Sequence, residues 1–226
     1  MAWSFFIFPI LLYFLYLLSG KILKEIQQLG GLEFLSFLIL PGTVVHELSH
    51  MICAELLFVK TAEFSFKPEI FENEARVGSL KMIKTDPIRR TIIGLAPPAG
   101  GLAIIGLVFH FYLLPQFLSP PRSPLGHLGG ALAFFAILYL IFAISITMFS
   151  SRKDLEVAIV PALILLVIIT TLWLLGFKLT IPNNLINLIN NFFIILNKAL
   201  ALVLGIDIVG FLLLKGLNLT VRRLLQ

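Results

Sequence analysis

The sequence predicts an all-α polytopic membrane protein with about six transmembrane helices and a small β-hairpin between the second and the third. Its mean hydropathy is +1.03, and 59% of its 226 residues are hydrophobic while only 13% are charged. Apolar runs of roughly 20 residues, enough to cross about 30 Å of hydrocarbon, recur along the chain. We therefore expect a single membrane-embedded domain over residues 1–226.

Six segments qualify as spans, and they cover about 2–19, 32–58, 91–114, 127–149, 155–176 and 199–217. Between the second and third, residues 60–86 alternate apolar with polar around the turn FENEA, which predicts the hairpin. Pro41 and Gly42 are placed to kink or loosen the second span, and Pro97 and Pro98 are expected to break the hydrogen-bond ladder of the third.

The C-terminal helices are expected over about 155–221. Before the last span, amide side chains recur at helical spacing, which predicts an amide face at the membrane interface or along a wet groove. These residues are Asn183, Asn187, Asn190 (or Asn191) and Asn197.

The positions of the basic residues predict the orientation of the chain. With a cytoplasmic amino terminus, the inner segments hold Lys60, Lys67, Arg76, Lys81, Lys84, Arg89, Arg90, Arg152, Lys153, Arg222 and Arg223. The outer segments then hold Lys21, Lys24, Arg122 and Lys178. Because basic residues favour the cytoplasmic side, we expect both termini there. Basic residues in short loops serve topology, so we expect no nucleic-acid partner.

The stretch VVHELSHMIC, residues 44–53, places three titratable groups in an apolar span. His46 and His50 are four residues apart and therefore share one helix face. This is the HExxH pattern, in which two histidines hold Zn²⁺ and the glutamate, here Glu47, takes a proton from the attacking water. The structural alternative is a set of polar residues packed between helices, but such groups are costly inside a membrane.

A catalytic zinc site needs a third protein ligand. Cys53 lies about 10 Å along the helix axis from His46, and Glu55 projects from the opposite side of the helix. Asp154 is the strongest choice, because it ends the fourth span on the same membrane side as His50. Its alternative role is to cap the fifth helix.

Other titratable residues fit the metal site less well. Asp207, inside the last span, needs a partner, which Lys215, an asparagine of the amide face or a water channel would supply. The remaining candidates fall in the predicted turn or near the opposite membrane face: Glu69, Glu72, Glu74, His110 and His127.

These residues resemble the site-2 protease family of intramembrane zinc metalloproteases, in particular its small prokaryotic members. The likeness covers HELSH on the second span, the hairpin, LAPPAGG on the third span and the aspartate that ends the fourth. It implies a catalytic core over about 32–155, with His46, His50 and Asp154 as Zn²⁺ ligands and Glu47 as general base. It also implies a multi-pass protein of a prokaryotic plasma (inner) membrane.

The chain departs from the family around Asp154. Ile146 and Leu155 stand where the family has an asparagine and a glycine. The group that stabilises the oxyanion therefore stays open among four residues: Ser145, Thr147, Arg152 and Lys153.

The expected function is hydrolysis of peptide bonds in membrane-spanning protein substrates near the cytoplasmic side. A strand edge around Phe64 and Phe66 would hold the substrate in extended form. The expected partners are that substrate and the lipid bilayer. Two alternatives remain open: a zinc-dependent membrane hydrolase of a non-peptide substrate, and a non-catalytic pseudoprotease or carrier that uses Asp207 and the amide face as a polar path.

Overall fold

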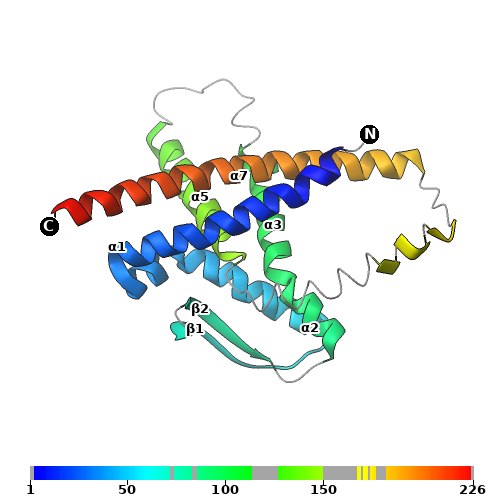
Figure 1. Ribbon diagram of the computed structural model, residues 1–226, viewed down its shortest axis with the longest axis horizontal. Helices are drawn as coiled ribbons and strands as arrows, with labels where there is room; N and C mark the ends of the chain where they lie inside the picture. The colour runs from blue at the N-terminus through cyan, green and yellow to red at the C-terminus, as the bar shows by residue number, and fades with distance from the viewer. Residues whose placement is uncertain are drawn as a thin grey trace.

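The computed structural model describes residues 3–71, 74–82, 86–113, 127–149, 167–168, 170–172, 174–176 and 182–224. Over these residues the chain is mostly α-helical (Figure 1). Three helical stretches are long and apolar enough to cross a membrane: Ser4–Leu56, Pro87–Tyr112 and Asn183–Leu224. Together they indicate an integral, multi-pass membrane protein. Most of the predicted fifth span, about 155–176, lies outside the described residues.

Helix α1, Trp3–Leu56, folds back on itself at Gly31 (Figure 1). Gly31 has φ 73° and ψ −165°, a conformation that glycine adopts without the steric strain of a side chain. We call residues 3–30 the first limb and residues 32–56 the second limb. The first limb is longer than the predicted span 2–19, because the apolar spacing continues through Ile22 and Ile26, which are fully buried.

The second limb covers the predicted span 32–58 almost completely. The backbone stays helical at Pro41, and the kink or loosening predicted there stays a prediction. A proline inside a helix removes one hydrogen bond, and packing of the buried neighbour Ile39 and the rest of this limb keeps the helix continuous.

Strands β1, Thr61–Phe71, and β2, Glu74–Met82, pair antiparallel where the sequence predicts a hairpin. Phe64 pairs with Leu80, and the register shifts between Ser65 and Pro68. Proline lacks the N–H that a regular ladder requires, which accounts for an irregularity at this point. Both strands contact α1.

The predicted third span consists of helices α2, Pro87–Gly94, and α3, Ala96–Val108, followed by the π-helical turn η1, Phe109–Leu113. The two helices meet at Leu95, two residues before Pro97. The break predicted from Pro97 and Pro98 is therefore confirmed. Helix α5, His127–Thr147, corresponds to the predicted fourth span.

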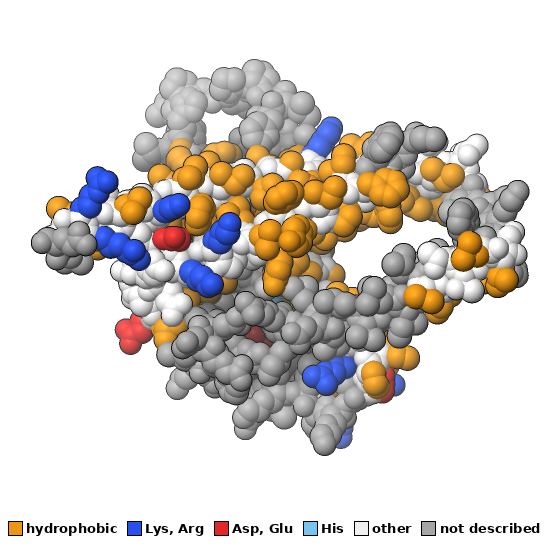
Figure 2. Space-filling model, viewed as in Figure 1, with side chains coloured by type: hydrophobic (Ala, Val, Ile, Leu, Met, Phe, Trp, Pro, Cys, Tyr) orange, Lys and Arg blue, Asp and Glu red, His pale blue; other side chains and the backbone are white. Residues whose placement is uncertain are grey.

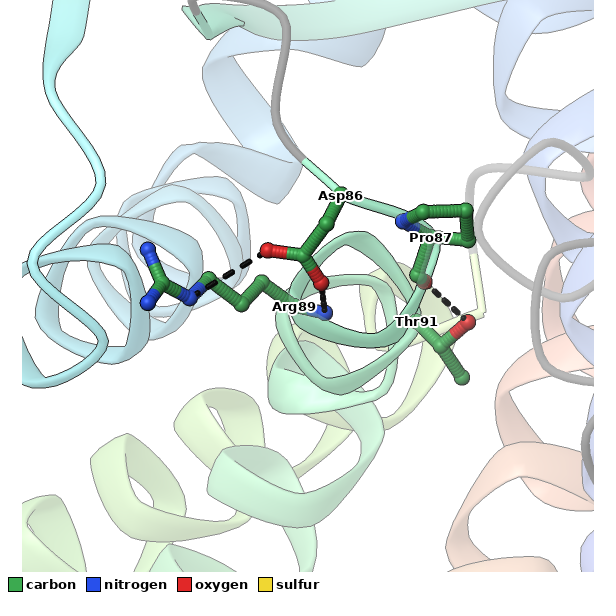
Figure 3. A network of polar contacts seen from close by, with 4 residues as sticks. All are labelled: Asp86, Pro87, Arg89 and Thr91. Carbon is green, nitrogen blue, oxygen red and sulfur yellow. Dashed lines mark hydrogen bonds and ion pairs between the residues drawn. The ribbon is translucent and has the colours of Figure 1, made fainter.

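Asp86 caps the amino terminus of α2 (Figure 3). Its carboxylate accepts a hydrogen bond from Arg89 N at 3.0 Å, and Arg89 Nε lies 3.3 Å from the other carboxylate oxygen. The hydrogen bond from Arg89 N, helped by the charge of the Arg89 guanidinium, lowers the pKa of Asp86 below its usual value. Within the same turn, the Thr91 hydroxyl donates to Pro87 O.

We expect the start of α2 to loosen when the Asp86 cap is removed. Because the pKa of Asp86 is lower in the folded chain, the cap stabilises α2 above the usual carboxyl pKa of about 4 and is lost as the pH falls through the folded value. Hydrogen-exchange protection of the Arg89 amide should fall in Asp86→Ala at neutral pH. In the control Asp86→Asn, whose amide also caps helices, protection should persist without the pH dependence. Equal protection in Asp86→Ala and wild type would show that the cap contributes nothing.

Helix α7, Asn183–Leu224, is a single helix of 42 residues. The predicted amide segment and the predicted last span are therefore continuous. Two amides of the predicted face contact the first limb rather than a wet groove: Ser4 Oγ donates to Asn190 Oδ1, and Asn197 Nδ2 donates to Ser4 O at 2.6 Å. Asn183 and Asn187 are exposed.

The first limb and α7 run parallel to each other. Ser4 meets Asn197 at one end, whereas Asn218 Nδ2 donates to Glu25 Oε2 at 2.6 Å near the other end. Figure 1 accordingly shows the two termini at opposite ends of the pair. The placement of both termini on the cytoplasmic side stays a prediction.

The core lies where α1, α3, α5 and α7 meet. Its fully buried centre includes Leu15, Ile105, Ile141 and Leu200, one from each helix. The outer faces are apolar instead of charged: Figure 2 shows hydrophobic side chains over much of α7, with basic side chains gathered toward its C-terminal end. This distribution suits a helix bundle surrounded by lipid.

Candidate metal centre

The three titratable residues of the motif lie on the second limb of α1 and are buried. His46, Glu47 and His50 are 5%, 4% and 6% exposed. The two imidazole rings lie one helical turn apart in an edge-to-face arrangement, with centroids separated by 4.9 Å and planes at 85°. The predicted shared face of the two histidines is therefore confirmed.

His50 is oriented by the neighbouring helix α2. Its Nδ1 lies 2.8 Å from Ile93 O, which is a main-chain carbonyl. A carbonyl oxygen only accepts, so Nδ1 carries a proton, and in the neutral ring Nε2 keeps its lone pair. Metal-binding histidines commonly have this arrangement, in which the second ring nitrogen donates to a carbonyl and fixes the ring.

Close contacts between helices hold the motif in place. Gly42, one turn before His46, lies so near α5 that an added Cβ would overlap Ala143 O and Thr147 Oγ1. Gly100 of α3 approaches Ser49, inside the motif, equally closely. These two glycines bring α3 and α5 against the second limb, as small residues do in membrane helix pairs.

The predicted metal site is only partly covered by the described residues. Asp154 lies outside them, seven positions after Thr147. Across the described part of the chain, no group of three His, Cys, Asp or Glu side chains is arranged to hold a metal ion. Two imidazoles one turn apart, one of them oriented through Nδ1, fit part of a zinc ligand set. Asp154 stays the predicted third ligand.

Three of the rejected candidates are bonded elsewhere or exposed: Cys53, Glu55 and His110. Cys53 donates a long hydrogen bond, 3.7 Å, to Ile92 O of α2. Glu55 is exposed, as expected for the opposite side of the helix, and His110 is exposed in η1. Phe64 and Phe66 lie on β1, beside the end of α1.

The partner of Asp207 is a residue that the sequence analysis did not assign to it. Ser145 Oγ of α5 lies 2.8 Å from both carboxyl oxygens of Asp207. Of the partners considered, Lys215 instead places Nζ 5.8 Å from the Phe211 ring centre. The signal available in the sequence was ISIT, a pair of hydroxyl residues inside an otherwise apolar span. The sequence suggests Ser145 only as a group that stabilises the oxyanion.

Comparison of the chain with protein-family models, with curated proteins and with solved structures finds no match.

Proposed function

We propose that this protein is an intramembrane zinc metalloprotease that hydrolyses peptide bonds of membrane-spanning substrates near the cytoplasmic side. The observation that carries the proposal is the burial of His46, Glu47 and His50 together on one limb of a membrane helix. Titratable groups are costly to bury in an apolar helix bundle, and a bound metal ion compensates for that cost. The membrane in question would be the plasma membrane of a prokaryote.

In the proposed site, His46, His50 and Asp154 hold the metal and Glu47 moves the proton. When bound, zinc would polarise the scissile carbonyl and lower the pKa of the attacking water. Glu47 accepts the proton of that water and delivers it to the leaving amine. The carbonyl of Ile93 keeps the His50 ring in the tautomer that presents Nε2 to the metal. Burial of all three motif residues limits the access of bulk water.

The substrate must be locally extended before cleavage, because a transmembrane helix locks its peptide groups in hydrogen bonds. The described sheet has two strands, so β1 has one edge that does not pair with β2. We assign this edge, around Phe64 and Phe66, as the place where a substrate segment adds as a strand. Strand β1 also contacts α1, the helix that carries the motif, which supports this assignment.

The alternative of a carrier receives less support from the described contacts. It would use Asp207 and the amide face as a polar path, but Asp207 bonds to Ser145 and Asn197 bonds to Ser4. These groups are engaged in helix packing. A zinc hydrolase with a non-peptide substrate would share the same metal site, and substrate profiling distinguishes it.

Metal analysis of the purified protein tests the proposal. We expect about one zinc ion per wild-type chain and loss of zinc in His46→Ala and Asp154→Ala, because each removes one of three ligands. The matched control is His110→Ala, whose exposed imidazole lies in η1. Zinc should be retained in that variant. A wild type without zinc, or full zinc content in His46→Ala, would contradict the proposal, and retention in Asp154→Ala would remove Asp154 from the ligand set.

A further inference from the structure

Asp207 and Ser145 form a polar contact in the interior of the helix bundle. Both residues are fully buried, at 0% exposure. Asp207 lies in the apolar part of α7, and Ser145 lies two residues before the end of α5. Carboxyl groups at such positions are costly and generally serve a purpose. The proposed proteolytic mechanism assigns no role to this one.

Ser145 and Asp207 join one face of α5 to α7. The opposite face of α5 contacts the second limb of α1. At 3.6 residues per turn, Ser145 projects about 200° around the helix from Ala143, whereas Thr147 lies within about 40° of it. Ala143 and Thr147 are the residues that approach Gly42. The last turns of α5 are therefore fixed between α7 on one side and α1 on the other.

We propose that Asp207 is a positioning residue for the metal centre, acting through Ser145. By holding Ser145, Asp207 keeps the Ala143 and Thr147 face of α5 against Gly42, one turn before His46. The end of α5 leads directly along the chain to Asp154. This inference rests on the proposed function and extends it to a residue that lies 53 positions after Asp154 and 157 positions after His50.

Two properties of the contact support a positioning role. The hydroxyl of Ser145 also lies 2.9 Å from Phe142 O, so it is anchored to its own helix as well as to Asp207. Buried side-chain bonds of this kind fix the register of one helix against another. Near the same crossing, Gly210 of α7 lies against the Phe142 ring, so α5 and α7 approach each other closely.

Zinc retention in four variants tests the proposal. Ser145→Ala removes the donor with little change in volume, and Asp207→Leu removes the acceptor. Asp207→Asn keeps one oxygen that accepts the Ser145 hydrogen bond. The control Ser36→Ala removes a hydroxyl that bonds only within its own limb, to Leu32 O. Each purified protein is challenged with a zinc chelator well below its unfolding temperature, and kcat and KM are measured on a cleavable membrane substrate.

We expect Ser145→Ala and Asp207→Leu to release zinc about tenfold faster or more, the scale on which outer contacts alter metal sites. Their kcat should fall while KM changes little. The rate of zinc release from Asp207→Asn should stay within about threefold of the wild-type rate. Ser36→Ala should release zinc at the wild-type rate.

Zinc retention and kcat within about twofold of wild type in both Ser145→Ala and Asp207→Leu would overturn the proposal. The proposal would also be overturned if each variant lost zinc only in proportion to its fraction of unfolded protein. The contact would then stabilise the fold without positioning the metal centre. A wild type that binds no zinc would instead overturn the proposed function, and this inference with it.

Discussion

Glu47→Gln should leave the fold and the zinc content unchanged while hydrolysis falls by at least about 100-fold, the contribution typical of a positioned general base. Glutamine has the same shape as glutamate but cannot accept the proton of the attacking water. Because Glu47 is 4% exposed, bulk solvent offers no ready substitute. Cleavage of a co-expressed membrane substrate, together with metal analysis of the same preparation, measures both effects.

Glu55→Gln is the matched control for this experiment. Glu55 lies on the same limb, but it is exposed and projects away from the histidines, so its amide variant should cleave at the wild-type rate. A Glu47→Gln protein that still cuts the substrate would rule out the proposed mechanism. Unchanged proteolysis alongside an altered lipid profile in cells carrying Glu47→Gln would favour the non-peptide hydrolase.

Gly42→Ala should weaken both the packing of α5 and the metal site. An added Cβ would overlap a main-chain oxygen, Ala143 O, as well as Thr147 Oγ1, and a main-chain atom cannot move aside as a flexible side chain does. Overpacking of this kind typically costs about 1 to 3 kcal/mol. We expect a lower unfolding temperature in detergent and faster loss of zinc, because α5 must move away from the motif helix.

Gly20→Ala provides the control for Gly42→Ala. Gly20 lies in the first limb, and an added Cβ there would meet nothing within 4 Å. Since alanine favours helix over glycine by up to about 1 kcal/mol, this variant should be as stable as wild type or slightly more so. If the Gly42 variant behaved like the Gly20 variant, the close contact between α1 and α5 would not hold in the protein.

Local patterns allowed the helices and the motif face to be predicted, whereas contacts between distant segments could not be. The spacing of His46 and His50 fixes their common face, because helical periodicity is a property of neighbouring residues. The hydrogen bond from His50 to Ile93 O and the contact of Ser145 with Asp207 depend on how separate helices pack. Hydropathy carries no information about such pairing.

The helix reversal at Gly31 is another feature that local sequence patterns did not predict. The sequence predicts two spans separated by a polar connection, and the connection is in fact the helical continuation of the first limb. Ile22 and Ile26 keep the apolar face of that continuation buried, and the lysines between and beside them stand on its outer side. The charges of these lysines suggest a loop, but the segment is helical because the helix buries its apolar face.

The parallel pairing of the first limb with α7 separates the two ends of the described chain. Ser4 bonds to Asn197, and 27 residues of helix, roughly 40 Å, lie between Asn197 and Leu224. Labels attached at the two ends would therefore stay far apart in the folded protein.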